Sequence, residues 1–221
     1  MTNFKERLDS IQKRIEEAAK HSGRSLADIS LIAICKQASV EQIREAYALG
    51  LRHFGESRLP SMLLKKESLP PDAIWHFVGT LQSNKAKKIA SCANFLHSVS
   101  SYKTAKLLSV LAKEQGSTYR IFLEVNLSRE LSKQGFSEAE ILSMWAEIRE
   151  LEGLTIQGLM VMGPQTQDKE LVRSCFQRAA YLQKQLPRIA PFLSMGMSED
   201  FSIAIEEGAT HVRVGRELFS G

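Results

Sequence analysis

Lys36 is the residue of this chain whose position most strongly suggests chemistry. It follows an apolar run at residues 31–35, which is typical of a buried strand in a parallel sheet. The carboxyl ends of such strands are where α/β folds gather their functional groups. A desolvated lysine there is an amine nucleophile that can form a Schiff base with a carbonyl compound. The alternative is a snorkelling lysine whose stem only covers the strand end.

A second group of candidate residues lies near the carboxyl terminus. Gly196 and Ser198 precede one expected helix, and Gly215 and Arg216 begin another. Backbone N–H groups at helix starts, a hydroxyl and a guanidinium together make an anion site, although Ser198 alone could simply cap its helix. Beside a lysine on the first strand, these groups favour a phosphorylated carbonyl ligand. Pyridoxal phosphate (PLP) fits best, because its aldehyde suits the lysine and its phosphate suits the loops.

The elements that would position these residues alternate along the chain. Capping boxes at Ser39–Gln42 and Ser137–Glu140 mark two helix starts. The apolar pattern predicts strands ending at residue 36 and at 51–55, 74–78, 95–97, 119–125, 154–162, 192–195 and 211–214. It predicts helices at 4–18, 39–50, 59–66, 83–90, 102–115, 137–151, 171–186 and 199–207.

About eight strand–helix units in about 200 residues predict an α/β fold of the (β/α)8 TIM-barrel class. We expect one domain, residues 1–221, with the extra N-terminal helix in residues 1–24 packed on the barrel. A doubly wound open sheet is the alternative fold. No GxGxxG motif follows the first strand, which argues against a dinucleotide site.

Composition narrows the class of protein. The hydrophobic fraction is 43%, the charged fraction 24% and the net charge +4, as in an ordinary globular protein that suits small anions rather than nucleic acid. Three separate cysteines, Cys35, Cys92 and Cys175, form no disulfide framework and predict a reducing, cytoplasmic location. The acidic N-terminus is no signal peptide, and no apolar run approaches 18 residues, so we expect no membrane span.

Several runs give the chain a specific resemblance. It resembles the pyridoxal phosphate homeostasis protein family, single-domain relatives of the alanine racemase barrel. The matching runs are residues 31–36 (LIAICK), 52–56 (RHFGE), 75–85 (WHFVGTLQSNK), 132–135 (SKQG), 158–163 (GLMVMG), 194–198 (SMGMS) and 211–216 (HVRVGR).

The resemblance implies a PLP Schiff base on Lys36 and Arg213 facing the pyridine nitrogen. It implies that the phosphate is surrounded by Ser194, Ser198, Gly215 and Arg216, and we expect Ser57, His76 and Met162 to complete the cofactor site. A guanidinium only donates hydrogen bonds, so Arg213 should keep the ring nitrogen unprotonated and the ring a poor electron sink. The implied role is intracellular PLP homeostasis, by buffering PLP or delivering it to apo-enzymes, with no established turnover reaction.

The chain departs from the family pattern at two positions. Ala38 stands where the family has a second lysine, and Ser57 stands where it has asparagine. A role of that second lysine in cofactor transfer therefore does not carry over, and the shorter Ser57 changes one expected cofactor contact.

The alternative function is enzymatic: a small PLP-dependent amino-acid racemase, or a Schiff-base lyase. A racemase needs a second acid–base group, which related racemases take from an added domain and a partner subunit, and with the chain ending at Gly221 we expect none. We expect a monomer. His53, His76 and His97 could suggest a metal, but hydrogen-bonding residues at the barrel mouth are the preferred interpretation. We also expect Glu56 to pair with a cation and Cys35 to pack toward a helix.

Overall fold

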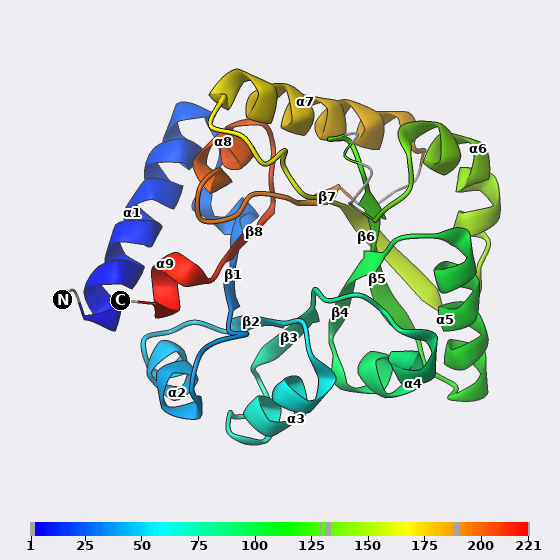
Figure 1. Ribbon diagram of the computed structural model, residues 1–221, viewed down its shortest axis with the longest axis horizontal. Coiled ribbons are helices and arrows are strands. Elements are labelled where there is room, and N and C mark those ends of the chain that lie inside the picture. Colours follow the sequence, from blue (N-terminus) through cyan, green and yellow to red (C-terminus); the bar gives the residue numbers. More distant parts are fainter. Residues whose placement is uncertain (1–2, 129, 131–133, 188–190, 221) are drawn as a thin grey trace.

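The computed structural model of the protein describes residues 3–128, 130, 134–187 and 191–220. Within them, eight parallel strands hydrogen-bond in chain order and close into a barrel (Figure 1). The strands are β1 (Ser30–Ile34), β2 (His53–Glu56), β3 (Ile74–Phe77), β4 (Phe95–Val99), β5 (Tyr119–Val125), β6 (Leu154–Val161), β7 (Phe192–Ser194) and β8 (His211–Val214). The predicted (β/α)8 barrel is confirmed, and the open-sheet alternative is wrong.

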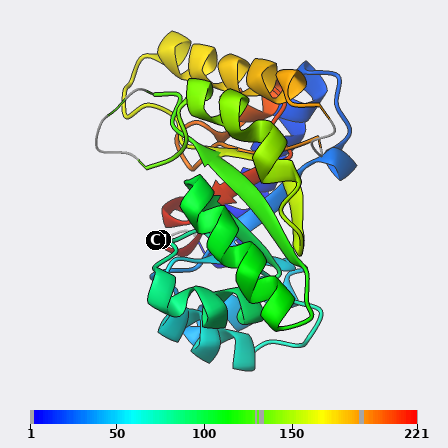
Figure 2. The same ribbon diagram turned by 90° about the vertical axis from the view of Figure 1, so that its right-hand side faces the viewer.

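The helices lie outside the strands in both views, as Figure 1 and Figure 2 show. They are α1 (Phe4–His21), α2 (Val40–Ala48), α3 (Leu59–Glu67), α4 (Ser83–Cys92), α5 (Tyr102–Glu114), α6 (Glu138–Arg149), α7 (Lys169–Gln185), α8 (Phe201–Glu206) and α9 (Arg216–Phe219), with a short 3-10 turn at Leu26–Asp28. In the described part of the chain, no helix has the length and apolarity needed to cross a membrane.

Local signals set most helix starts. Both predicted capping boxes are present: Ser39 and Ser137 accept the N3 amide, and Gln42 and Glu140 bond back to the cap. Helix α8 differs from the prediction, because it begins at Phe201 after Asp200 rather than at Glu199. Ser198 therefore lies in the preceding turn and does not cap this helix.

Helix α1 packs on α8 and α9, the last two helices of the barrel. The Phe4 and Phe219 rings lie 5.5 Å apart, and the Arg7 Nε–H donates to the Leu218 carbonyl at 3.0 Å. The Arg14 guanidinium stacks 4.3 Å from the centre of the Phe201 ring. These contacts place α9 beside the first turns of α1 (Figure 1).

The two faces of the barrel strands differ in chemistry. Side chains facing the helices are mostly apolar, as in the contact between the Phe54 and Trp75 rings at 5.7 Å, with the buried Glu56 on β2 as an exception. The interior instead carries polar residues, including His76, His97 and Arg213, in a place where TIM barrels usually have branched apolar residues. Buried polar groups need hydrogen-bond partners, so the interior has to satisfy them internally or through a ligand.

We expect Gly79, just after β3, to be required for the close approach of β2 and β3. A Cβ atom at this position would lie 2.2 Å from the Ser57 carbonyl oxygen, and backbone atoms cannot move aside easily. Gly79→Ala should therefore lower the free energy of unfolding by about 1–3 kcal/mol in urea titrations. In Gly116→Asn, the control, the new side chain has open space and a backbone conformation that asparagine tolerates, so the change should stay within about 0.5 kcal/mol. Equal effects in the two variants would contradict this explanation.

Candidate cofactor site

Lys36 lies in a turn just beyond β1 and is exposed. The prediction of a desolvated lysine at the strand end is therefore wrong, because β1 stops at Ile34. The Ala38 N–H donates to the Cys35 carbonyl at 3.0 Å, which closes the turn and leaves Lys36 at its outer edge. Its side chain makes no hydrogen bond or ion pair with the described residues, so its amine is free to react.

Barrel closure brings Lys36 beside the residues predicted to bind phosphate. Strand β1 pairs with β8, with Ala33 opposite Val214. Lys36, Gly215 and Arg216 consequently line one small hollow of about 10 Å³. At Gly215 a Cβ atom would lie 2.9 Å from the Ile34 carbonyl oxygen, so glycine allows this close packing.

The other phosphate candidates lie around the same end of the barrel. The Arg216 guanidinium is exposed and pairs with Glu199 at 3.1 Å. Exposed pairs of this kind are weak, typically about 0–1 kcal/mol, so this guanidinium can turn toward an anion at little cost. Ser198 is half-buried in the turn before α8, and its carbonyl accepts from Arg14 at 3.4 Å.

Arg213 is 6% exposed and extends into the barrel interior. Its Nη1 donates to the carbonyl and the hydroxyl oxygens of Ser194, both at 2.7 Å, and Nη2 donates to the Val161 carbonyl at 3.1 Å. A guanidinium has five N–H bonds, and in the described residues two of them, on Nε and Nη2, have no acceptor. It also forms no ion pair there, which is unusual for a buried cation.

Two carboxyl groups lie within electrostatic range of Arg213. Burial lowers the pKa of Arg213 to about 10, while Asp200 and Glu124 act in the opposite direction. Burial raises the pKa of both Glu124 and Asp200, and the charge of Arg213 partly offsets this. Arg213 is thus a cation at neutral pH, and it retains donors for a ligand acceptor.

Three histidines form a hydrogen-bonded row that leads to Arg213. His53 Nδ1 lies 2.9 Å from His76 Nε2, His76 Nδ1 lies 2.8 Å from His97 Nε2, and His97 Nδ1 lies 2.9 Å from the Ser194 hydroxyl. The hydrogen-bonding interpretation is confirmed, but the barrel-mouth location is wrong. His53 begins β2, and His76 and His97 are fully buried in mid-strand. Because both ring nitrogens of His76 are engaged, the predicted cofactor contact of this residue would have to use ring carbon.

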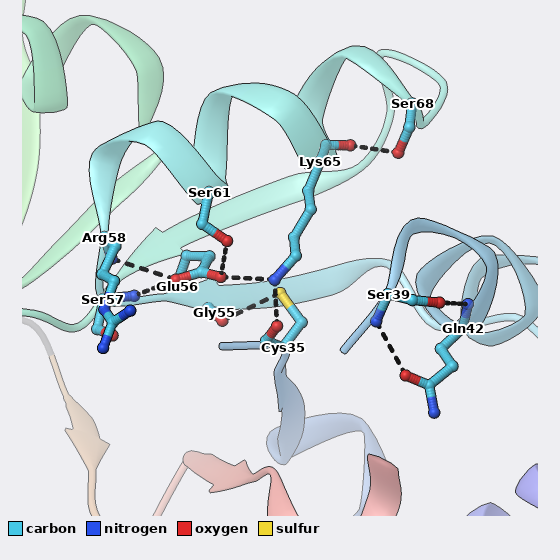
Figure 3. A network of polar contacts seen from close by, with 10 residues as sticks. All are labelled: Cys35, Ser39, Gln42, Gly55, Glu56, Ser57, Arg58, Ser61, Lys65 and Ser68. Atoms are coloured by element: carbon cyan, nitrogen blue, oxygen red, sulfur yellow. Dashed lines mark hydrogen bonds and ion pairs between the residues drawn. The ribbon is translucent and has the colours of Figure 1, made fainter. Parts of the chain in front are cut away.

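The strongest ion pair near Lys36 lies outside the barrel, between β2 and α3 (Figure 3). Lys65 donates to the Glu56 carboxylate at 2.7 Å and to the Cys35 carbonyl that closes the Lys36 turn. Glu56 also accepts from the Ser61 hydroxyl at 2.6 Å and the Ser57 amide at 2.7 Å. This network therefore fixes the backbone at the carboxyl ends of both β1 and β2.

The predicted cation partner of Glu56 is confirmed, but Lys65 itself was not predicted. Its signal was a single lysine on the apolar face of α3, four residues before Leu69 and three after Met62. Burial opposes ionisation of Glu56, yet hydrogen bonds from Lys65 and Ser61 outweigh it, so its pKa is lowered.

Cys35 packs toward α3, as predicted. Its thiol donates to the Gly55 carbonyl at 3.2 Å, and burial raises its pKa to about 12. A thiol with such a pKa carries almost no thiolate at neutral pH and is a poor nucleophile.

The remaining predicted site residues lie at the same end of the barrel. Ser57 follows β2 and Met162 follows β6, and both are half-buried. Their contact with a cofactor stays a prediction. Ser132 and Lys133, from the motif at 132–135, lie outside the described residues.

Comparison with known proteins identifies the family. Residues 7–221 match the alanine racemase N-terminal domain family. A pyridoxal phosphate homeostasis protein of Pseudomonas aeruginosa is 36% identical over 220 residues, covering 99% of this chain and 96% of the relative. The chain belongs to the pyridoxal phosphate homeostasis protein family. The relative from Aquifex aeolicus is also 36% identical, over 98% of this chain and 97% of its own length.

Solved structures agree with this homeostasis protein assignment. PipY of Synechococcus elongatus, solved without PLP, is 37% identical and superposes with a TM-score of 0.83 over 93% of this chain and 99% of PipY. The PipY structure with PLP bound is 36% identical, with a TM-score of 0.81 over 94% and 100% of the two chains. An alanine racemase of Clostridium difficile shares only the fold, at 14% identity and a TM-score of 0.78, over 99% of this chain and 56% of the racemase.

We expect loss of Lys65 alone to destabilise the protein strongly, because Lys65 is the cation that compensates the buried Glu56 carboxylate. Lys65→Met leaves the Glu56 carboxylate buried without its cation, which should lower the free energy of unfolding by about 3–5 kcal/mol. The double variant with Glu56→Gln should recover part of this loss, since it buries no charge. Urea unfolding measures both, and Lys66→Met, at the exposed neighbour on α3, is the control, with an expected change within about 0.5 kcal/mol. Equal losses in Lys65→Met and Lys66→Met would contradict the role of the pair.

We also expect stability to fall as the pH drops below about 6.5. Burial lowers the pKa of His211 from 6.5 to about 4, with His53 and Arg213 acting in the same direction. Above pH 6.5 His211 is neutral in both the folded and the unfolded protein. Between pH 6.5 and about pH 4 it takes up a proton only in the unfolded protein. At about 1.4 kcal/mol per pKa unit, this single group accounts for about 3 kcal/mol over that window.

The measurement for this pH dependence is urea unfolding of the protein and of His211→Leu across the same pH range. The difference between the two slopes isolates His211 from the buried carboxyl groups and from His76 and His97, whose pKa values are also lowered by burial. Identical slopes would show that His211 does not carry the effect.

Proposed function

We propose that this protein binds PLP in the cytoplasm and takes part in PLP homeostasis, holding the cofactor on Lys36 and buffering or delivering it. The observation that carries the proposal is Arg213, a buried cation with two N–H groups that have no acceptor among the described residues. It lies at the same barrel end as Lys36, whose side chain bonds to no described residue. The membership of the family and the PipY structure with PLP bound support the same ligand.

The residues present fit the cofactor by their chemistry. Lys36 supplies the amine for the aldehyde, and Gly215, Arg216 and Ser198 supply donors for the phosphate. Ser194, which the resemblance placed at the phosphate, is fully buried with its hydroxyl bonded to His97 and Arg213, so its proposed role is to hold Arg213 for the ring nitrogen. Ser57 and Met162 would flank the ring from β2 and β6.

The donor set favours retention over turnover. Bound PLP supplies an electrophilic aldehyde and an aromatic ring that withdraws electrons most strongly when its nitrogen is protonated. Arg213 only donates hydrogen bonds, so at the ring nitrogen it favours the unprotonated, weaker electron sink. This supports a carrier more than a racemase or a lyase.

The exposure of Lys36 supports release. Water or a competing amine can reach a bond formed at a side chain in an exposed turn. Ala38 is buried where the family has its second lysine, so delivery from this chain would not use a lysine at that position. Apo PLP enzymes are the proposed acceptors. The proposed cytoplasmic location is supported by the three free cysteines, which suit a reducing compartment. The monomeric state stays a prediction.

We expect borohydride reduction of the PLP-loaded protein to fix a pyridoxyl group on the peptide that contains Lys36. Lys36→Ala should abolish this labelling and the absorbance of bound PLP, because the amine is lost. Lys85→Ala, at an exposed lysine on α4, should leave both unchanged. Label on another peptide in the unmodified protein would overturn the assignment of Lys36.

Delivery is tested with the same loaded protein and an apo PLP enzyme, in the presence of a scavenger that removes free PLP. Recovery of enzyme activity despite the scavenger supports direct delivery. If free PLP restores activity while the loaded protein never does, the role is storage rather than delivery.

A further inference from the structure

We propose that His97, His76 and His53 are positioning residues for the cofactor site. They form a hydrogen-bond chain with one direction, anchored at Arg213 through Ser194, that fixes where the guanidinium points. The role of the chain toward a cofactor rests on the proposed function, whereas its direction and protonation state do not. We call the three imidazoles the histidine row.

The direction of the row is set at Arg213, which can only donate. The Ser194 hydroxyl accepts from Arg213 at 2.7 Å and lies 2.9 Å from His97 Nδ1. If the Ser194 hydroxyl donates its proton to His97 Nδ1, both its donor and its acceptor capacity are used. If His97 Nδ1–H instead donates to the hydroxyl oxygen, the Ser194 hydroxyl proton has no acceptor among the described residues. Ser194 is fully buried, so this unmade hydrogen bond is unfavourable.

The direction then propagates from ring to ring. Because His97 accepts at Nδ1, its proton is on Nε2, which donates to His76 Nδ1 at 2.8 Å. His76 repeats the pattern, and its Nε2–H donates to His53 Nδ1 at 2.9 Å. All three imidazoles are therefore neutral Nε2–H tautomers, and His53 is the half-buried end of the row.

Packing and burial keep the row in this state. The His76 ring stacks on Phe95 with centroids 4.8 Å apart and an angle of 8°, and His97 stacks on Phe122 at 4.3 Å and 21°. These contacts restrict ring rotation. A protonated ring would carry hydrogen on both nitrogens and would place one of them against the donor of its neighbour.

The row orients a donor and does not deliver a proton. The row leads through Ser194 to Arg213, which has no acceptor site, so a proton cannot pass through Arg213 to a bound ligand. Without the row, the Ser194 hydroxyl could rotate, and Arg213 could turn toward Glu124 or Asp200, the carboxyl groups that influence it. The competing explanation is that the histidines only fill the barrel interior.

The first test uses the unmodified protein without cofactor. Long-range proton–nitrogen NMR correlation of the histidine rings reports which nitrogen carries hydrogen. We expect Nε2–H at His53, His76 and His97 at neutral pH. Nδ1–H at His97 or His76, or a doubly protonated ring in the row, would overturn the proposed direction, whether or not PLP binds.

The second test measures PLP affinity and the pH titration of the bound-cofactor absorbance. His97→Leu removes the acceptor for Ser194, and we expect PLP affinity to fall by about tenfold or more, as for a lost buried hydrogen bond. His97→Asn keeps an acceptor near the Nδ1 position and should retain affinity within about threefold. His76→Leu leaves His97 Nε2–H without its acceptor. Its PLP affinity should lie between those of the two His97 variants, and the pH titration of the bound-cofactor absorbance should shift.

His211→Leu is the matched control for interior packing. His211 is a buried imidazole whose ring lies 6.2 Å from that of His76 and 6.4 Å from that of His97, but it bonds to Thr210 at 2.8 Å and not to the row. It should leave PLP affinity within about threefold of that of the unmodified protein. If it weakens PLP as much as His97→Leu does, with folding of both variants verified by circular dichroism, the histidines are interior filling and the proposal fails. Absence of PLP binding by the unmodified protein would instead refute the proposed function and leave the NMR test decisive for the row.

Discussion

A guanidinium inside a closed barrel is the constraint around which the interior of this protein is organised. A buried cation is unfavourable unless hydrogen bonds and charges compensate for lost water. Arg213 donates hydrogen bonds to three acceptors, two oxygens of Ser194 and the Val161 carbonyl. Its charge is also stabilised electrostatically by Glu124 and Asp200. Polar residues consequently replace part of the apolar interior usual in such barrels. Among the described residues the compensation is incomplete, because two of the five N–H groups of Arg213 have no acceptor there, and this is the basis of the proposed cofactor contact.

The second buried cation, Lys65, is stabilised differently. Lys65 forms an ion pair with Glu56 at 2.7 Å, so its charge is neutralised within the protein. The pair lies outside the barrel (Figure 3) and does not face a ligand in the interior. Lys65 has a structural role, because it donates to the Cys35 carbonyl in the turn that carries Lys36. One cation thus holds the backbone of the site, while the other remains partly available. This division lets an exposed amine stay in a defined place without being buried.

Much of the architecture could be predicted from sequence because its signals are local. Capping boxes at Ser39 and Ser137 need only three following residues, and strand hydrophobicity needs only a run of neighbours. Those signals gave eight strand–helix units and hence the barrel. They were weakest where a polar loop precedes a short helix, as at Ser198, because Asp200 competes as the starting residue.

The sequence by itself determined the order of elements, the family and the position of Lys36 beside the first strand. Only the tertiary structure decided which residues meet. Strand register placed His76 opposite Phe95 and brought its ring within hydrogen-bonding distance of His97, and barrel closure brought Gly215 to Lys36. Both outcomes depend on contacts between residues far apart in the chain, and such contacts have no local pattern that a single sequence could display. The exposure of Lys36 follows instead from the local turn after β1, and the Lys65–Glu56 pair forms within the β2–α3 unit, where α3 turns its one buried lysine back onto the strand.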